Sequence, residues 1–196
     1  FSYLHLAVES ELTEVLLEKR ITSISYETIQ TDDGELPLLI PMSEIAGKMS
    51  VQIAASLLEK NKDGKGILLG GVPGVKRGKI VILGAGHVGI SAARIAVGLG
   101  ADVCVLDINI SKLRYIEKHI SSGIKTYLAT KENISRETKD ADALIGAVLV
   151  AGAKTPCLVS EDIVKNMPQG SVIIDLSINQ GGIVETVDRC TTLDNP

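Results

Sequence analysis

From residue 79 onward, short apolar runs alternate with amphipathic segments. The first of these runs has no polar position, which is typical of a strand buried on both faces of a sheet. The runs lie at residues 80–83, 103–106, 124–129, 141–150 and 171–176. Between them apolar residues recur at helical spacing, with Ser111 and Ser160 as predicted helix caps. Strands that alternate with helices predict an α/β fold with a parallel, doubly wound sheet, which binds ligands at the carboxyl ends of its strands.

The pattern before residue 79 is different. Residues 1–7 predict a short strand or strand end, Ser10 can cap a helix, and residues 21–28 alternate only partly and predict a strand. A long amphipathic helix follows, with Ser43 as its predicted N-cap. We place a domain boundary near Pro41. Residues 1–41 then belong to a second domain, and residues 42–196 form the α/β domain, with residues 42–60 as the connecting helix.

A glycine motif follows the first apolar run. Gly84, Gly86 and Gly89 form G-x-G-x-x-G, and a helical pattern begins at once. The first glycine permits a tight turn, the second lets a pyrophosphate approach the backbone, and the third lets the helix pack closely on the strand. The N–H groups and the positive end of the helix dipole favour a phosphate there.

Asp107 closes the second apolar run. A carboxylate at that strand tip accepts hydrogen bonds from a ribose 2′-OH and repels a 2′-phosphate, so NAD is preferred over NADP. Glycine loops alone are common, but strand, glycines, helix, strand and acid in this order favour dinucleotide binding over a purely structural turn. We therefore predict a Rossmann-type sheet with NAD as its cofactor. We also expect few structural reasons for a carboxylate at Asp107.

Composition narrows the function classes. The 196 residues suffice for one large domain or for one domain and part of another, and a hydrophobic fraction of 45% indicates a globular protein with a real core. The net charge of −4 gives no basic surface for nucleic acid, and no apolar run reaches transmembrane length. Cys104, Cys157 and Cys190 lack metal-site spacing, which indicates reduced thiols in a cytoplasm and no metal. Cys104 lies within a predicted strand and is expected in the core.

Six stretches resemble the alanine dehydrogenase/transhydrogenase family. They are FSYLHLA, LPLLIPMSEIAGKM, GKGILLGGVPGVKRGKIVILGAGHVG, AVGLGADVCVLDIN, DALIGAVLVAGAK and GSVIIDLSINQGG, and they extend from Phe1 to Gly182. The resemblance implies NAD-dependent oxidative deamination of L-alanine to pyruvate and ammonium, by a homo-oligomer that is commonly a hexamer. It also implies that residues 1–41 are a remnant of a substrate domain.

The same resemblance implies that parts of the family's machinery have no counterpart here. These are the N-terminal segment with a substrate-binding Arg and a catalytic Lys, and the C-terminal segment that closes the cofactor site. We therefore expect an NAD-binding fragment that does not turn over alanine by itself.

The family's functional positions can be matched residue by residue. His5 stands where the family has the His that polarises the substrate carbonyl. Asn179 stands where the family has an acid/base Asp, and an Asn can orient a water but cannot accept its proton. Ala129 replaces a Ser at the adenine end. The matched cofactor positions are Ser43, Gly84, Gly86, His87, Val88, Gly89, Asp107, Lys112, Val148, Leu149, Leu176 and Ile178.

Several of these residues also have a purely structural interpretation. His5 can be a core histidine, Ser43 only a helix cap, and Asn179 a turn residue; the side chains of His87 and Lys112 can simply be solvated. Two other functions also stay open. The chain can be the NAD(H)-binding component of a proton-translocating transhydrogenase, although the GHVGISAARIAVGLGAD and PMSEIAGKM stretches are closer to alanine dehydrogenase. It can also be a non-catalytic NAD(H)-binding module, for which Asn179 is the favouring feature.

Overall fold

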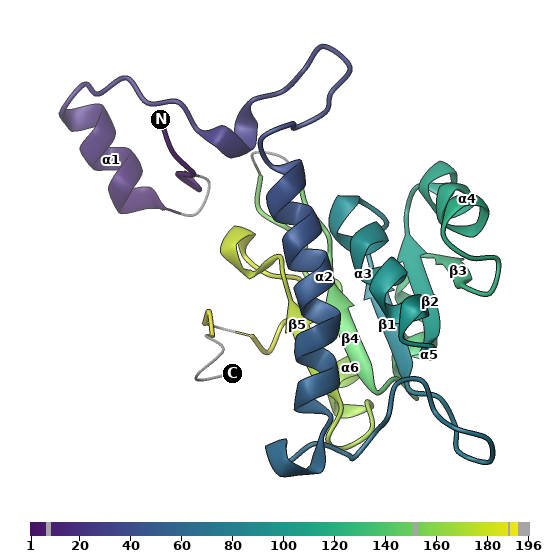
Figure 1. Ribbon diagram of the computed structural model, residues 1–196. Helices are drawn as coiled ribbons and strands as arrows, with labels where there is room; N and C mark the ends of the chain where they lie inside the picture. The colour runs from purple at the N-terminus through teal and green to yellow at the C-terminus, as the bar shows by residue number, and fades with distance from the viewer. Residues whose placement is uncertain (7–8, 151–152, 188, 192–196) are drawn as a thin grey trace.

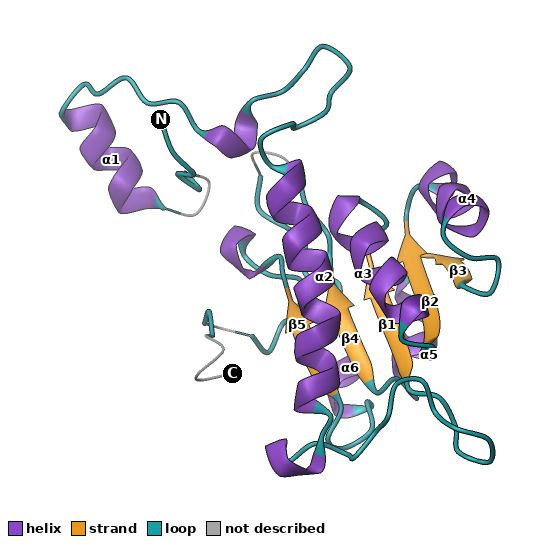
Figure 2. Cartoon of the chain, in the orientation of Figure 1, coloured by secondary structure: helices purple, strands orange, loops and turns teal. Residues whose placement is uncertain are grey.

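The computed structural model describes residues 1–6, 9–150, 153–187 and 189–191. Its centre is a parallel five-stranded sheet in the order β3-β2-β1-β4-β5 (Figures 1 and 2). The strands are β1 (Lys79–Leu83), β2 (Asp102–Asp107), β3 (Lys125–Leu128), β4 (Ala143–Gly146) and β5 (Val172–Asp175). The predicted Rossmann-type α/β fold is confirmed. The fourth strand is shorter than predicted, because the chain leaves the sheet after Gly146.

Helices cover both faces of the sheet (Figure 1). On one face lie α2 (Ile40–Leu57), α3 (His87–Gly98) and α4 (Ile110–His119), and on the other lie α5 (Lys131–Thr138) and α6 (Glu161–Lys165). Successive strand residues point to opposite faces, so Ile80 and Ile82 join the first core, and Val81 and Leu83 the second. Cys104 belongs to the second core, as expected, and burial raises the pKa of its thiol to about 12.

The long helix α2 packs very closely on α3. A Cβ atom on Gly47 would lie 2.2 Å from the carbonyl oxygen of Val88, so only glycine allows this contact. The helix begins at Ile40, with Leu39 as its N-cap and Pro41 in its first turn, where a missing N–H costs nothing. The prediction of Ser43 as N-cap is wrong, since Ser43 lies inside the helix and donates its N–H to Leu39 O at 3.0 Å.

Two other predicted caps are displaced by one or two residues. Glu9, not Ser10, is the N-cap of α1 (Ser10–Glu18). Asn109, not Ser111, caps α4, because its side chain accepts hydrogen bonds from two N–H groups of the first turn. Ser160 occupies the N-cap position of α6, as predicted.

The described residues of the N-terminal part, 1–6 and 9–39, do not form the strands predicted at 1–7 and 21–28. Its described residues show one parallel bridge, between Ser2 and Ser25, and the 3₁₀ turn η1 (Tyr26–Thr28); residues 7 and 8 lie outside the described ranges. The carboxylate of buried Glu27 accepts hydrogen bonds from the N–H groups of Leu4 and His5. In a strand these N–H groups would instead donate to a neighbouring strand. α1 buries none of its residues and lies apart from the sheet (Figure 1). The remaining short helices are η2 (Lys60–Lys62) and η3 (Ile178–Gln180).

Candidate functional site at the carboxyl ends of the strands

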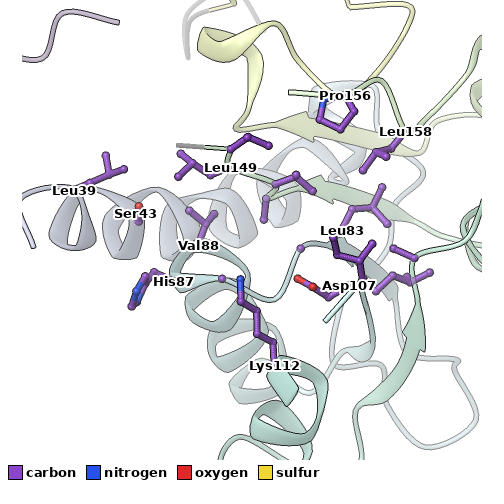
Figure 3. A pocket seen from close by; sticks show the side chains of 18 of the residues that line it. Leu39, Ser43, Leu83, His87, Val88, Asp107, Lys112, Leu149, Pro156 and Leu158 are labelled. Atoms are coloured by element: carbon purple, nitrogen blue, oxygen red, sulfur yellow. The ribbon is translucent and has the colours of Figure 1, made fainter. Parts of the chain in front are cut away.

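A cavity of about 340 Å³ lies where β1, β2 and β4 end (Figure 3). The order of strands reverses there, because β1 continues along the chain to β2 on one side and pairs with β4 on the other. In open parallel sheets such a switch point is where ligands bind. The lining is largely apolar, and its polar side chains include Ser43, Asp107 and Lys112. This is the size and character of a small-ligand site.

The three glycines shape the floor of the cavity. Gly84 has a φ of +108°, and a Cβ atom there would lie 2.4 Å from the carbonyl oxygen of Ala147. A Cβ atom on Gly89 would lie 1.9 Å from the oxygen of Gly84, so α3 can approach the turn only because residue 89 has no side chain. Around Gly86 there is open space. The backbone therefore has the tight turn, close packing and free approach that the motif predicts.

The amino end of α3 faces this open space. The first helical hydrogen bond runs from Ile90 N–H to the carbonyl of Gly86, which is the N-cap. The N–H groups of His87, Val88 and Gly89 therefore have no acceptor within α3, all of which is described. Such groups, together with the positive end of the helix dipole, suit an anionic oxygen.

Asp107 has a structural role that its sequence position did not indicate. The residue is 9% exposed, and its carboxylate accepts hydrogen bonds from Ala85 N–H at 2.6 Å and Asn109 N–H at 2.7 Å. It thus fastens the end of β2 to the glycine turn, and the expectation of few structural reasons for it is wrong. A carboxylate offers about four lone-pair sites, so two bonds leave acceptor capacity on the cavity side.

Other predicted cofactor residues gather at the same cavity. Ser43 comes from α2, Lys112 from α4, and Val148 and Leu149 from the segment after β4 (Figure 3). Ala129 lines it as well. The side chain of His87 lies at the mouth, with Nε2 3.2 Å from Glu35 Oε2; the two side chains are 48% and 52% exposed. Predicted residues from four separate parts of the chain thus meet in one place.

The remaining predicted residues do not line this cavity. Gly89 lies beneath the turn, and Leu176, Ile178 and Asn179 lie in the loop after β5, where exposed Asn179 accepts a hydrogen bond from Cys190 Sγ at 3.3 Å. His5 has a φ of +49° instead of the predicted strand conformation, and its N–H donates to Glu27 at 2.6 Å. Its Nδ1 is buried with no hydrogen-bond partner among the described residues.

The sequence interpretation missed Asp175, and it included Ser177 only as part of the matched loop of residues 176–179. Asp175 ends β5 and accepts hydrogen bonds from Ser177 N–H at 2.9 Å and Ile183 N–H at 2.7 Å. The hydroxyl of Ser177 donates to Val148 O at 2.6 Å and so joins the loop after β5 to the cavity wall. The sequence did hold a signal for Asp175, because it directly follows the apolar residues 172–174 as Asp107 follows the apolar residues 103–106.

A cluster of displaced pKa values lies at the opposite end of the sheet. Burial alone would lower the pKa of Lys79, but hydrogen bonds to Asp140 and Glu137 outweigh it and leave that pKa raised. Burial would likewise raise the pKa of Glu137 and of Asp140, but bonds from Lys79 keep both below their ordinary values. These groups face one another rather than the cavity, so their pKa shifts come from mutual pairing and do not mark a second candidate site.

In the part of the chain that the structure describes, no helix has the length and apolar character needed to span a bilayer. Nor do three or more His, Cys, Asp or Glu side chains of the described residues come together in a way that could hold a metal ion.

Comparison with known proteins matches nearly the whole chain. The family model described as "Alanine dehydrogenase/PNT, N-terminal domain" matches residues 1–46, and the corresponding C-terminal domain matches residues 50–196. The alanine dehydrogenase of Methanococcus maripaludis is 55% identical over 100% of this chain and 52% of its own length. That of Staphylococcus saprophyticus is 54% identical, over 100% of this chain and 53% of its own. The chain spans about half the length of the curated relatives it matches.

Solved structures agree with this match. An L-alanine dehydrogenase is 50% identical, with a TM-score of 0.87, over 96% of this chain and 52% of its own. A transhydrogenase from Sinorhizobium meliloti has a TM-score of 0.76 at 22% identity, over 95% of this chain and 55% of its own, a likeness that shows the fold alone.

Proposed function

The chain belongs to the alanine dehydrogenase/PNT family, and from this premise we propose that it forms the NAD-binding part of an NAD-dependent alanine dehydrogenase. Such an enzyme oxidatively deaminates L-alanine to pyruvate and ammonium. The observation that carries the proposal is the cavity at the switch point, where Gly86 leaves open space at the amino end of α3 beside the carboxylate of Asp107. Relatives named alanine dehydrogenase support the choice of substrate.

The residues of the cavity fit a dinucleotide. The free N–H groups at the start of α3 would hold the pyrophosphate, and the remaining acceptor sites of Asp107 would hold an adenosine ribose. Lys112 would lie beside the adenosine, Ser43 would contact the cofactor from α2, and Val148 with Leu149 would form an apolar wall near the nicotinamide ribose. When bound, NAD would accept the hydride from the substrate carbon. The protein contributes positioning and exclusion of water.

The chemistry of the substrate is assigned by resemblance. His5 would polarise the substrate carbonyl, and Asn179 would orient a water without accepting its proton. Leu176 and Ile178 would lie beneath the nicotinamide. We also propose the division into a substrate-domain remnant (1–41) and a cofactor domain (42–196), a homo-oligomeric assembly and a cytoplasmic location.

Calorimetric titration with NADH and, separately, NADPH tests the cofactor assignment. We expect NADH to bind and NADPH to bind at least about tenfold more weakly, because Asp107 would repel the 2′-phosphate. Equal binding of the two would contradict the role of Asp107. If neither binds, either the C-terminal segment that closes the cofactor site is required for binding or the glycine turn is only structural, and the cofactor assignment then rests on the resemblance alone.

A second candidate is a non-catalytic NAD(H)-binding module. Asn179 favours it, since this side chain cannot titrate where the family has an acid. The substitution Asn179→Asp in the whole protein separates the two, with alanine-dependent NADH production as the measurement. A large gain in rate indicates a weakened enzyme, and no gain indicates a binding module.

A further inference from the structure

We propose that Asp175 is a positioning residue that holds the loop of residues 176–183 as a rigid support for the nicotinamide half of the cofactor cavity. The inference deepens the proposed function and rests on it. Asp175 is not among the residues matched by resemblance. The proposed function also gives it no role in binding the pyrophosphate or the adenosine.

The carboxylate of Asp175 binds both ends of the loop. Its Oδ1 accepts Ser177 N–H at 2.9 Å, and its Oδ2 accepts Ile183 N–H at 2.7 Å. Two glycines make room for it: a Cβ atom on Gly146 would lie 3.1 Å from Oδ1, and one on Gly182 would lie 3.0 Å from Oδ2. One side chain, packed against the end of β4, thus ties the start of the loop to its return.

The loop in turn holds the cavity wall. Ser177 is 5% exposed, and its hydroxyl donates a hydrogen bond to Val148 O at 2.6 Å. Thr155 N–H donates to Gln180 O at 2.8 Å, and Leu158 N–H donates to Ile183 O at 2.8 Å. Val148 and Leu158 line the cavity, as does Pro156 next to Thr155 (Figure 3). These three hydrogen bonds therefore fix the cavity wall that follows β4 to the loop of residues 176–183.

The other half of the cavity rests on different elements. The glycine turn belongs to β1 and α3, Asp107 to β2, and Lys112 to α4. A change confined to the loop after β5 should therefore move the wall near Val148 and leave the pyrophosphate and adenosine contacts in place. Hydrogen bonds to an ionised carboxylate are about twice as strong as neutral ones, so removing the charge should loosen the loop measurably.

The variant Asp175→Asn tests this on the chain itself. The amide keeps the shape, but its NH₂ group cannot accept one of the two N–H bonds. Calorimetry should show NADH binding weakened by about tenfold, the loss expected for one bond to a charged group, while ADP-ribose, which lacks the nicotinamide, changes by less than about twofold. Ser177→Ala, which removes only the bond to Val148, should weaken NADH by about threefold and leave ADP-ribose unchanged.

Asp142→Asn is the matched control. Asp142 is also a carboxylate with two donors, Lys79 N–H at 2.9 Å and Lys65 Nζ at 2.6 Å, but it lies at the amino end of β4. It should lower the melting temperature without changing the ratio of NADH to ADP-ribose affinity. An unchanged ratio in Asp175→Asn, whether both ligands bind as before or both weaken equally, overturns the inference.

Two other outcomes are decisive. If Asp175→Asn does not fold, Ser177→Ala decides, and equal effects on both ligands overturn the inference. If the unsubstituted chain binds neither ligand, the inference fails together with the cofactor assignment on which it rests. If the unsubstituted chain binds both ligands and their affinity ratio is unchanged in the variant, the inference alone fails.

Discussion

The two ends of the parallel sheet are built from different interactions. At the carboxyl end, glycines bring backbone atoms together: a Cβ atom on Gly89 would lie 1.9 Å from the oxygen of Gly84. At the amino end, charged side chains pair at the edge of the core, where Lys79 and Glu137 are buried and Asp140 is exposed. Lys79, whose side chain is 7% exposed, places Nζ 3.0 Å from Glu137 Oε2 and 2.6 Å from Asp140 Oδ1.

This difference separates binding from stability. Backbone N–H groups can face a ligand only where no side chain covers them, so the carboxyl end relies on turns and close packing. The amino end faces no such demand, and its side chains pair with one another. Substitutions at the carboxyl end should therefore impair cofactor binding, whereas those at the amino end should reduce the free energy of unfolding alone.

The largest effect is expected from Gly89→Ala. The added methyl cannot fit beside the oxygen of Gly84, so α3 must move away from the turn. We expect unfolding free energy to fall by about 4 kcal/mol and NADH binding to be lost. Gly98→Ala, in the same helix, is the matched control, because no heavy atom lies within 4 Å of its Cβ position. It should be neutral or stabilise the helix by up to about 1 kcal/mol. Urea unfolding and calorimetry measure both; tolerance of Gly89→Ala would contradict the close packing.

Lys79→Met should have the next largest effect. It leaves the buried carboxylate of Glu137 with Arg136 as its remaining partner, at 2.9 Å, and breaking a buried pair costs about 3 kcal/mol. The affinity for NADH should stay within about twofold, because the substitution lies at the far end of β1. Lys125→Met is the control: its pair with Asp102 is partly exposed, so it should cost at most about 1 kcal/mol. A large loss of NADH affinity in Lys79→Met would show that the two ends are coupled.

The same cluster predicts how stability depends on pH. The pKa of Glu137 lies below its ordinary value of 4.5 and that of Asp140 below 3.8, so the stability they supply is present above these values and is lost as the pH falls through the lowered ones. The pKa of Lys79 is raised above 10.5, so its contribution is complete below that value and is lost as the pH rises through the raised one. Urea unfolding should therefore give a plateau between about pH 5 and pH 8, because above that range the buried Cys104 thiol, whose pKa is raised from 9.0 to about 12, adds its own loss of stability. In Lys79→Met the alkaline fall should shrink; an unchanged profile would contradict the pairing.

The sequence was sufficient to predict the carboxyl end in outline. A run that is apolar at every position, such as residues 80–83, favours a strand buried on both faces, and the spacing of Gly84, Gly86 and Gly89 predicts the geometry of the turn. Helix caps were less predictable, since Asn109 competes with Ser111 for one helix start and Pro41 moves the start of α2. Those choices depend on differences of about 1 kcal/mol between neighbouring residues.

Contacts between distant segments were beyond the sequence pattern. Asp107 accepts from a residue 22 positions earlier, and Asp175 from one 8 positions later, so their structural roles follow only from the folded sheet. Residues 21–28 alternate enough to suggest a strand, but Glu27 turns inward and binds the backbone at His5 instead. A side-chain-to-backbone hydrogen bond of this kind competes with regular secondary structure, and it leaves no periodic pattern in the sequence.

The smallest effect is expected from the exposed side-chain contact between Glu35 and His87 at the carboxyl end of the sheet. Both side chains are about half exposed, so Glu35→Gln should change the free energy of unfolding by no more than about 0.5 kcal/mol. NADH affinity should change by less than about threefold, and any effect should disappear in about 1 M salt, which screens exposed charges. His87→Gln, which removes the other partner, should match it. A tenfold or greater loss of affinity in both variants would mean that the segment before α2 holds the glycine turn in place, and the carboxyl end would then depend on charge pairing as the amino end does.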